Sequence, residues 1–599
     1  MLHGKVTFNS FIMMRFISFI LFLFLLSSLM SCKTDTESMD DTIHVRIEKD
    51  PERLHPLIFP NSAAREIYQY IFLPLADYNS ESLELEPLLI TKIPEKQSIS
   101  SGPYAGGIRF DIEIRPEAVW EDGSPITAKD YIFSLKAIRM PLNNTSRYRD
   151  ILTNIAAVEE DPSNPKKFSV IMYKDDMNAL ELCIQWEIYP AYFYDPQNIL
   201  ERLDLSKLTS DTVYEKQVMA DSSFLAFAES FNGLEYSSQK ISGSGPYKFT
   251  SWESNQYLVL EKKQDYWGTG LQIDHLKNNP DKIVFHMMPD DVAAMVQLKE
   301  GNIDIMNNVD DDDFLALQKD KTYKDQFQFF SPSLTKYYVI LLNNKDPKLN
   351  DKKVRRALAH LVDVDHILNK LENGFGQRLA TPVHPSKSYY HKDLKPIPFS
   401  LENAQSLLAD AGWKDSNNDG TLDKTLDGKK TELVLDMYVS GQELGNQVAL
   451  LLQQNAQKVG IKINMIEKEF KAVRSEHIKT RNYHLVPSVV STDLNTWDDL
   501  KTRYHSEFDN PSGANETGYY NVEADNILTQ IPAENDLKKR AALYKKLQEI
   551  IYDDQPMIYL FVPAERIILN KIWKGNATQK RPGYAVNQFE MIGKRATKK

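Results

Sequence analysis

The chain has 599 residues, of which 42% are hydrophobic and 26% charged, and its formal net charge at pH 7 is −12. This size and composition are typical of a globular protein with several hydrophobic cores. An acidic chain with scattered basic residues argues against nucleic acid as a partner, because nucleic-acid binding needs a basic surface.

The N-terminus has the three parts of an export signal. Arg15 precedes an apolar run over residues 16–26, and small residues then lead to Leu-Met-Ser-Cys, which ends at Cys32. A basic start, a short apolar run and a cleavage site are the features of a signal peptide, and a membrane span would need about 20 apolar residues. We therefore predict a signal peptide over residues 1–31 and an acidic tether over residues 32–41.

The Leu-Met-Ser-Cys ending resembles a bacterial lipobox, which implies cleavage before Cys32 and a diacylglycerol on its sulfur. The alternative is an ordinary signal peptide with an incidental cysteine. Cys183 is the only other cysteine. After lipidation the chain has no internal pair, so packing must hold it together. Cys183 lies in an apolar stretch that we predict to be a strand with the thiol buried.

Alternating apolar and polar residues predict strands at 43–47, 108–114, 257–260 and 283–286. In the second strand, Ile108, Phe110, Ile112 and Ile114 share one face. Helices are predicted at 292–300, after Asp351, after Ser400, at 447–459 and at 537–552, several of them stopped by glycine. The last helix places Leu537, Ala541, Tyr544, Leu547 and Ile551 on one stripe. Interleaved strands and helices predict an α/β protein of more than one lobe.

The stretch from Trp120 to Asp130 carries two adjacent carboxylates, Glu121 and Asp122. The Asp-Gly pair that follows is a common way to reverse a chain between strands. Thr127 and Asp130 have the spacing of a capping box ahead of an apolar helix. We therefore predict a strand, a tight turn and a capped helix, which makes this stretch scaffold rather than a reactive loop.

Eight motifs in chain order, from residue 50 to residue 560, resemble those of the family 5 extracellular solute-binding proteins, the oligopeptide-binding type that serves ABC importers. The longest is F-D-I-E-I-R-P-E-A-V-W-E-D-G-S-P-I-T-A-K-D at 110–130. The others are D-P-E-R-L-H-P (50–56), G-S-G-P-Y-K-F-T-S-W (243–252), D-Y-W-G (265–268), G-N-I-D-I (301–305), V-R-R-A-L-A-H-L-V-D (354–363), A-D-A-G-W (409–413) and D-Q-P-M-I-Y-L (554–560).

The resemblance implies an α/β fold of the two-lobed periplasmic binding protein type II, in its large three-segment form, with mixed sheets flanked by helices and a hinge cleft. Lobe I takes residues 42–75, 236–335 and 556–599, with an inserted subdomain at 76–235, and lobe II takes residues 336–555. The stretch 337–344 resembles a crossover strand, which places Tyr337 and Tyr338 near the hinge.

The function implied is that of a substrate-binding lipoprotein of an ABC importer. It captures oligopeptides or similar small solutes between its lobes and delivers them to the permease subunits. The expected protein is a monomer, lipid-anchored on the periplasmic side of the cell envelope, without cofactor or enzymatic activity. The alternatives are a binding protein for a non-peptide solute, such as a nickel chelate or a sugar, and a secreted surface hydrolase.

The resemblance also implies a ligand site. In peptide-binding members a carboxylate of lobe II holds the α-amine of the peptide, and the matching stretch here, V-V-S-T-D-L-N, places Asp493 in that role with Ser491 and Thr492 as backbone partners. Val490 stands where a large residue is usual, and Leu494 replaces a usual tyrosine. The alternative for Asp493 is a solvated loop acid that follows a strand.

Three further residues complete the implied site. On lobe I, the segment from Asp50 to Glu52 offers the facing edge. Arg566, beyond the return crossover, is the candidate to meet a ligand carboxylate.

Two other patterns have the residue types of a metal site. Residues 415–423 look like the front of a calcium loop, but Leu426 stands where an EF-hand needs a glutamate, so we favour an Asx-rich turn. His360, Asp363 and His366 do not share one helix face well, so we predict no metal there either.

Overall fold

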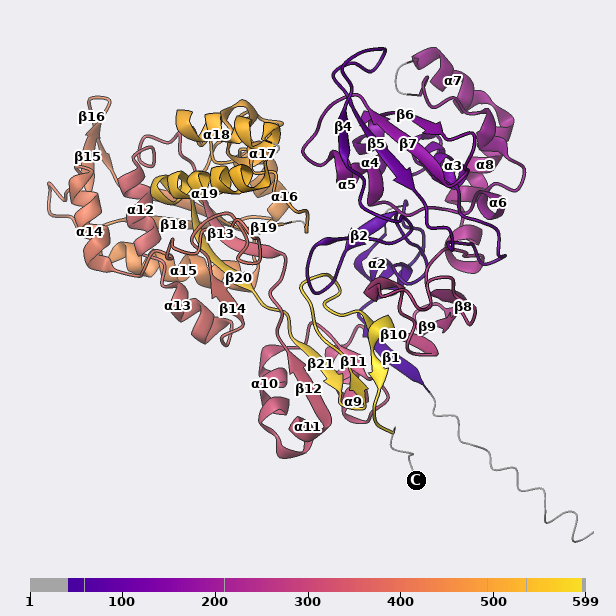
Figure 1. Ribbon diagram of the computed structural model, residues 1–599. Coiled ribbons are helices and arrows are strands. Elements are labelled where there is room, and N and C mark those ends of the chain that lie inside the picture. The colour runs from indigo at the N-terminus through magenta and orange to yellow at the C-terminus, as the bar shows by residue number, and fades with distance from the viewer. Residues whose placement is uncertain (1–40, 59, 209–210, 493, 535, 595–599) are drawn as a thin grey trace, which may run out of the picture. The chain divides into compact units, whose positions relative to one another are not determined.

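A computed structural model describes residues 41–58, 60–208, 211–492, 494–534 and 536–594 (Figure 1). The predicted signal peptide, Cys32 and Asp493 lie outside these residues. The described chain is an α/β protein with sheets of seven, six and four strands and three smaller sheets of two strands each. Among the helices of the described ranges, none combines the length and hydropathy of a membrane span.

The seven-stranded sheet is built around β1, which pairs in parallel with β10 and β11. Ile43, Val45 and Ile47 of β1 are at most 1% exposed, because the alternation predicted from the sequence turns them into the core. The strand order is β12 (Phe327–Phe330), β21 (Ile567–Asn570), β11 (Ile305–Met306), β1 (Thr42–Ile47), β10 (Lys282–Met287), β9 (Tyr257–Lys262) and β8 (Tyr247–Glu253).

The six-stranded sheet has a hydrophobic core on each face. The order is β14 (Gly376–Arg378), β20 (Met557–Pro563), β13 (Lys336–Leu342), β19 (Leu485–Ser491), β17 (Val434–Val439) and β18 (Lys462–Glu467). Helices α12 (Lys352–His360), α14 (Leu401–Asp410) and α15 (Glu443–Gln457) contribute to one core. Helices α18 (Val522–Ala533) and α19 (Leu537–Asp554) contribute to the other core (Figure 1).

The four-stranded sheet lies in the region predicted to be inserted. Its order is β4 (Lys96–Ser98), β5 (Ile108–Glu113), β7 (Lys167–Met172) and β6 (Ile155–Glu160). Helices α3 (Ala128–Arg139), α7 (Thr212–Ala220) and α8 (Ser222–Asn232) belong to the same part of the chain.

The small sheets pair β2 (Ala76–Tyr78) with β3 (Leu85–Pro87), β15 (Asp423–Leu426) with β16 (Lys429–Glu432), and β22 (Trp573–Lys574) with β23 (Glu590–Met591). The remaining α-helices are α2 (Ser62–Tyr68), α4 (Ser146–Arg149), α5 (Ala179–Ile184), α6 (Ala191–Tyr194), α9 (Asp291–Lys299), α10 (Asp311–Lys319), α11 (Lys321–Gln326), α13 (Val364–His366), α16 (Phe470–Ala472) and α17 (Lys501–Tyr504).

The chain passes between the seven-stranded and six-stranded sheets twice, from β12 to β13 and from β20 to β21. The two connections pair with each other. Leu334 N–H donates to the carbonyl of Pro563, and Glu565 N–H donates to that of Pro332, both at 2.8 Å. The segment predicted to return at residue 556 begins inside the six-stranded sheet, because β20 pairs there with β13 and β14. The residue limits of the lobes stay a prediction.

The predicted elements are largely confirmed. All four predicted strands are present, and Ile108, Phe110, Ile112 and Ile114 are at most 3% exposed. Asp351 and Ser400 cap α12 and α14 through their side chains, as predicted. The helix predicted at 447–459 begins earlier, at Glu443.

Two predictions are wrong in part. Cys183 is buried as expected, but it lies in α5 and not in a strand, because a short apolar run does not by itself distinguish a buried strand from a buried helix turn. Burial raises the pKa of its thiol to about 12, so the group is not a nucleophile at neutral pH. Leu537 begins α19 as predicted but is 63% exposed, since the first turn of the helix extends beyond the core.

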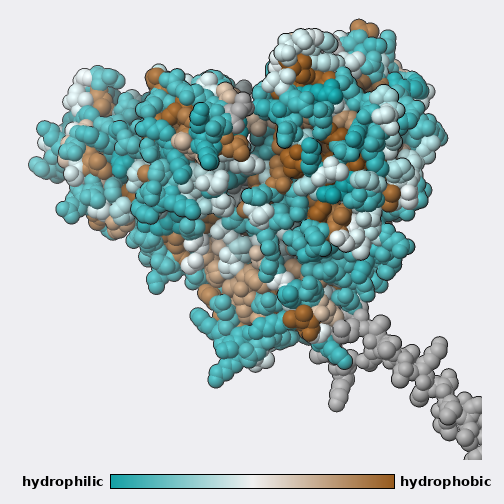
Figure 2. Space-filling model, in the orientation of Figure 1, coloured by the Kyte–Doolittle hydropathy of each residue, from teal (hydrophilic) through white to brown (hydrophobic). Residues whose placement is uncertain are grey.

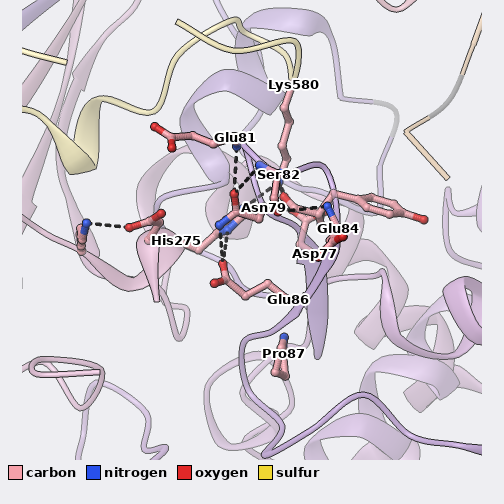
Figure 3. Close-up of polar contacts among 12 residues, drawn as sticks. Asp77, Asn79, Glu81, Ser82, Glu84, Glu86, Pro87, His275 and Lys580 are labelled. Atoms are coloured by element: carbon pink, nitrogen blue, oxygen red, sulfur yellow. Dashed lines mark hydrogen bonds and ion pairs between the residues drawn. The ribbon is translucent and has the colours of Figure 1, made fainter. Parts of the chain in front are cut away.

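A polar cluster fixes the C-terminal segment to β2 and β3 (Figure 3). The Lys580 ammonium donates to the Asp77 carboxylate at 2.5 Å, to the Tyr78 carbonyl at 2.8 Å and to Nε2 of His275 at 2.7 Å. Nδ1 of His275 then faces the Glu86 carboxylate at 3.4 Å. Burial disfavours the Asp77 carboxylate, but Lys580 and His275 outweigh burial and hold the pKa of Asp77 well below its usual range.

Candidate functional site

Strand β19 has a neighbour on one side along its whole length and on the other side at a single residue. β13 pairs with it from Lys336↔Ser491 to Leu342↔Leu485, whereas β17 pairs with it only at Met437↔Leu485. β17 ends at Val439, and the chain turns away at Gly441, whose φ is +74°. In the described part of the chain, no strand lies beside residues 487–491 on the side away from β13. We call this vacancy the open strand position.

The hydrogen bonds between β13 and β19 decide which residues face the open strand position. Thr492 N–H donates to the Thr335 carbonyl at 2.9 Å, and Asn343 N–H donates to the His484 carbonyl at 3.1 Å. The even-numbered residues of β19 therefore pair with β13. In an antiparallel ladder the intervening residues direct both backbone groups to the other side. Val489 and Ser491 thus present an N–H and a C=O to the open strand position.

Pro487 occupies the third of these outward-facing places. Proline has no N–H, so within a sheet it is tolerated where that group would face an unpaired edge. Its presence in the middle of β19 agrees with the hydrogen-bond pattern. The edge therefore offers complete donor and acceptor pairs at Val489 and Ser491 only.

A hollow of about 170 Å³ lies on the face of the sheet that carries α15. We call it the β19 hollow, and none of its lining residues is charged. Its lining is Tyr338, Val339, Val439, Ser440, Gln442, Leu444, Gly445, Val448, Phe470, Pro487, Ser488, Val489 and Leu560. The surface in Figure 2 is largely hydrophilic, yet Phe470 is 46% and Val489 41% exposed at this hollow. Exposed apolar residues gathered around a hollow indicate a surface for binding.

Of the residues predicted on this sheet, Asp493 lies outside the described residues. Ser491 is exposed and faces the open strand position with its backbone. Thr492 uses its N–H for the Thr335 carbonyl, so that group is already occupied. The role of these residues in ligand binding stays a prediction.

Asp50 is held by the protein itself. Its carboxylate accepts hydrogen bonds from the Asn255 N–H at 2.7 Å, the Ser254 hydroxyl at 3.1 Å and the Trp252 indole at 3.3 Å, which tie it to the loop between β8 and β9. It also accepts from the N–H of Glu52 at 2.7 Å. Glu52 is exposed and has a φ of +61°. The Asp50 side chain thus shapes this loop, and Glu52 is the one with a solvent-facing carboxylate.

Arg566 is the last residue of the second connection between the sheets, directly before β21. Its Nε donates to the Val309 carbonyl at 2.6 Å, and its guanidinium lies 5.5 Å from the ring centroid of Phe375. The preceding residue, Glu565, is buried and accepts from Arg581 at 2.6 Å and from the N–H of Asn308 at 3.1 Å. The cation that we predicted to meet a ligand carboxylate therefore already has a carbonyl and an aromatic partner.

A second hollow, of about 420 Å³, was not anticipated from the sequence. It lies after the carboxyl ends of β1 and β11, the place where ligands bind in open α/β sheets. Charged residues line it, and they include Glu48, Lys49, Arg65, Glu66 and Arg581. Burial raises the pKa of Glu66 to about 7, although the Tyr584 hydroxyl donates to its carboxylate. These residues come from distant parts of the chain, so no local spacing in the sequence predicts this hollow.

The stretch from Trp120 to Asp130 is scaffold, as predicted. The Glu121 carboxylate pairs with the Lys263 ammonium at 2.9 Å, and Asp122 accepts from the N–H of Ser124 at 2.9 Å within the turn. The Asp130 carboxylate accepts from the N–H of Thr127 at 2.9 Å, which completes the capping box of α3. Each acid of the stretch is engaged in local structure.

The two metal-like patterns are also engaged internally. Asp415 accepts from the N–H groups of Asp419 and Gly420, as in an Asx-rich turn. Nδ1 of His360 contacts the Pro398 carbonyl at 2.7 Å, and Asp363 caps α13. Among the described residues, no three His, Cys, Asp or Glu side chains gather closely enough to hold a metal ion.

The described chain thus has two large sheets joined by paired connections, with an open strand position and hollows at their edges. Residues 93–511 match the bacterial extracellular solute-binding proteins, family 5 Middle. The chain belongs to this family, and the predicted α/β fold class is confirmed.

Several known proteins are similar along most of their length. The oligopeptide-binding protein AppA of Bacillus subtilis is 26% identical over 518 residues, which cover 84% of this chain and 86% of AppA. The structure of AppA with a nonapeptide has a TM-score of 0.60 at 23% identity, covering 92% of this chain and 98% of that chain. HbpA2 of Haemophilus parasuis has a TM-score of 0.72 at 19% identity, covering 92% of this chain and 99% of that chain. NikZ of Campylobacter jejuni with Ni(L-His) has a TM-score of 0.61 at 21% identity, with the same coverage.

Proposed function

We propose that this solute-binding protein captures oligopeptides and delivers them to an ABC importer. The observation that carries the proposal is the open strand position beside β19, where the backbone groups of Val489 and Ser491 have no strand partner among the described residues. An extended peptide added there gains main-chain hydrogen bonds whatever its side chains are, which is the β-augmentation mode. The oligopeptide-binding relatives support the same ligand class.

The amine end of the peptide is proposed to meet Asp493, two residues beyond Ser491 in the chain. An ammonium group enclosed by protein loses its water and needs a fixed counter-charge. An open edge can pair with a strand of either direction, so the position of the amine fixes the direction of the ligand. If its amine lies at Asp493, at the carboxyl end of β19, the peptide runs antiparallel to β19. On the seven-stranded sheet, Glu52 and the charged hollow after β1 are the proposed facing surface, with Arg566 as the proposed carboxylate partner.

Two other functions are alternatives to peptide capture. A non-peptide solute is the stronger rival, because NikZ, which was solved with Ni(L-His), has the same fold. A hydrolase is the weaker rival, because the acids of the Trp120–Asp130 stretch are engaged in local structure. We propose that the protein binds its solute without chemical change and without a cofactor.

The location follows from the N-terminal sequence. We propose a monomer anchored by lipid on Cys32 to the periplasmic side of the cell envelope, with the lobe limits implied by the resemblance. A single acyl chain anchors weakly, whereas several chains on one cysteine hold firmly. Cys32→Ser should therefore release the exported protein from the membrane fraction. A variant that still fractionates with membranes would contradict the lipid anchor.

Calorimetry with a free-amine peptide and its N-acetylated form tests the function. Removing one partner of a buried ion pair typically costs about 3–5 kcal/mol, which is more than a factor of one hundred in affinity. Asp493→Ala should lose about this much for the free-amine peptide and far less for the acetylated one. Wild-type protein should also melt at a higher temperature with peptide and leave the peptide intact. Consumption of the peptide, or binding of only a non-peptide solute, would overturn the proposal.

A further inference from the structure

A further hollow, of about 240 Å³, is formed by the turn between β2 and β3, residues 274–277 and the C-terminal segment. We call it the Ser80 hollow, and it shares no lining residue with the β19 hollow or with the hollow after β1. Its volume is just below the roughly 300–1,000 Å³ of pockets that hold drug-sized ligands, so it suits a smaller ligand. Its lining is Ser80, Glu81, Asp274, Lys277, Lys574, Gly575, Asn576, Thr578, Ala585, Gln588, Phe589 and Glu590.

The walls of the Ser80 hollow are held by hydrogen bonds of the protein itself. In the turn between β2 and β3, the Asn79 side chain accepts from the N–H of Glu81 at 2.9 Å (Figure 3). In the C-terminal wall, the buried Asn587 amide donates to the Lys277 carbonyl at 2.9 Å. Walls that are already fixed need little ordering when a ligand binds.

Ser80 brings an unsatisfied hydroxyl group to this hollow. The residue is 6% exposed, and in the part of the chain that the structure describes its Oγ has no hydrogen-bond partner. Ser80 also lines an adjoining cavity of about 20 Å³, which shares Ala585 and Gln588 with the hollow. A cavity of this size accommodates one water molecule or one hydroxyl group of a ligand. Because a buried hydroxyl without a partner is costly, Ser80 needs a partner that the described chain does not provide.

The charged residues of the lining, in contrast, are already engaged. Lys277 pairs with Asp274 at 2.6 Å, and Lys574 pairs with Glu590 at 3.4 Å. The fifth charged residue, Glu81, accepts from a side-chain amide of the same lining at 2.9 Å. A charged ligand would compete with one of these contacts, whereas a neutral hydroxyl group can bond to the hollow without displacing them.

We propose that the Ser80 hollow is a second binding site, and that its ligand is a neutral carbohydrate. Ser80 and Thr578 offer hydroxyl groups, and Asn576 and Gln588 offer amide groups. Side chains of these two kinds both donate and accept hydrogen bonds, as the hydroxyl groups of a sugar do. The inference does not depend on peptide capture, because the residues that line this hollow belong to neither of the surfaces proposed for the peptide.

Two variants test the site. Ser80→Ala removes a hydroxyl that has no partner within the described chain, so it should not lower the urea midpoint. It should weaken sugar binding by roughly tenfold, because a ligand hydroxyl is then buried without its partner. Ala585→Phe fills both the hollow and the adjoining cavity and should abolish sugar binding. Ser98→Ala, at an exposed residue of β4, is the control and should bind as wild type does.

The experiment is saturation-transfer NMR with titration on the full chain. The neutral probes are D-glucose and N-acetyl-D-glucosamine, and the charged probes are D-glucuronate and D-glucosamine. Wild-type protein should bind a neutral sugar in preference to both charged ones by roughly tenfold, because a charged group would lose water without gaining a free partner. Peptide affinity, measured by calorimetry, should be the same in wild type and Ala585→Phe.

Each other result decides against the inference. If wild-type protein binds neither neutral sugar, the site is overturned and peptide capture is unaffected. Sugar binding that survives in both Ser80→Ala and Ala585→Phe would place the sugar elsewhere in the molecule. Tighter binding of a charged probe would overturn the ligand class. The Ser80→Ala result stands even if Ala585→Phe does not fold.

Discussion

The open strand position beside β19 and the polar cluster around Lys580 are opposite kinds of region. At β19, backbone groups of Val489 and Ser491 have no strand partner in the described chain, and the hollow beside them carries no charge. Around Lys580, charged groups are concentrated, and Asp77, His275 and Glu86 all have partners within the cluster (Figure 3). Under the proposed function, unmet hydrogen-bonding capacity, and not density of charge, distinguishes the proposed binding surface from scaffold.

The two acids that precede α3 are a further example of charged groups that already have partners. Glu121 and Asp122 look reactive in the sequence, but an ammonium group and a backbone N–H occupy them. A peptide arriving at such groups would have to displace existing partners. At β19 it would only have to displace water.

The largest effect on the free energy of unfolding should come from the polar cluster around Lys580. Lys580→Met leaves the Asp77 carboxylate without its main cation and should lower the free energy of unfolding by about 3 kcal/mol, the lower end for a buried pair, because Asp77 is partly exposed. Urea denaturation measures this loss. Lys574→Met is the control. Its pair with Glu590 is mostly exposed, so the loss should stay below about 1 kcal/mol. Equal losses in both variants would refute the distinction.

Proline substitutions at neighbouring residues of β19 test the open edge itself. Val490→Pro removes an N–H on the side that pairs with β13 and should destabilise the protein by about 1–3 kcal/mol. Ser491→Pro removes an N–H that faces the open position. It should change stability little, as Pro487 already occupies an equivalent place, and should weaken peptide binding by roughly tenfold. Denaturation and calorimetry on both variants are the measurements, and a reversed pattern would mean that the edge is assigned to the wrong residues.

Glu66, in the charged hollow after β1, is intermediate between the open strand position and the polar cluster around Lys580. It is buried with the Tyr584 hydroxyl as a donor, and burial raises its pKa to about 7, above the value for an unfolded chain. The folded state therefore holds the proton more tightly. Protonated Glu66 therefore contributes its full stabilisation of the folded state below about pH 4.5. This contribution is lost as the pH rises through about 7, and the free energy of unfolding then falls by at most about 1.4 kcal/mol per pH unit. Glu187 behaves in the same way, because burial raises its pKa to about 7 as well.

The substitution Glu66→Gln keeps the size of the side chain and removes its titration. Denaturation midpoints of wild-type and variant protein at pH 5 and pH 7.5 should differ less for the variant. Glu432→Gln, at an exposed residue of β16, is the control and should behave like wild type. An identical pH dependence in wild type and Glu66→Gln would exclude Glu66 as the group responsible.

The sequence by itself determined the local elements and the family. Strand alternation placed Ile43, Val45 and Ile47 in a core, and capping residues fixed the starts of α3, α12 and α14, because these signals depend only on neighbours in the chain. Motifs in order over most of the chain were sufficient for the family, which the comparison confirms. The helix around Cys183 was missed, because a short apolar run has no periodicity that separates a strand from a helix.

The site was decided by the tertiary structure. Whether an N–H of β19 is free depends on where β17 ends and on the pairing with β13, and neither can be read from residues 485–491 alone. The β19 hollow joins residues from four strands and from two helices, and the hollow after β1 joins residues that are hundreds of positions apart. Hydrogen bonds and burial are properties of neighbours in space, so the sequence could name candidate residues, and only the fold could show which of them already had partners.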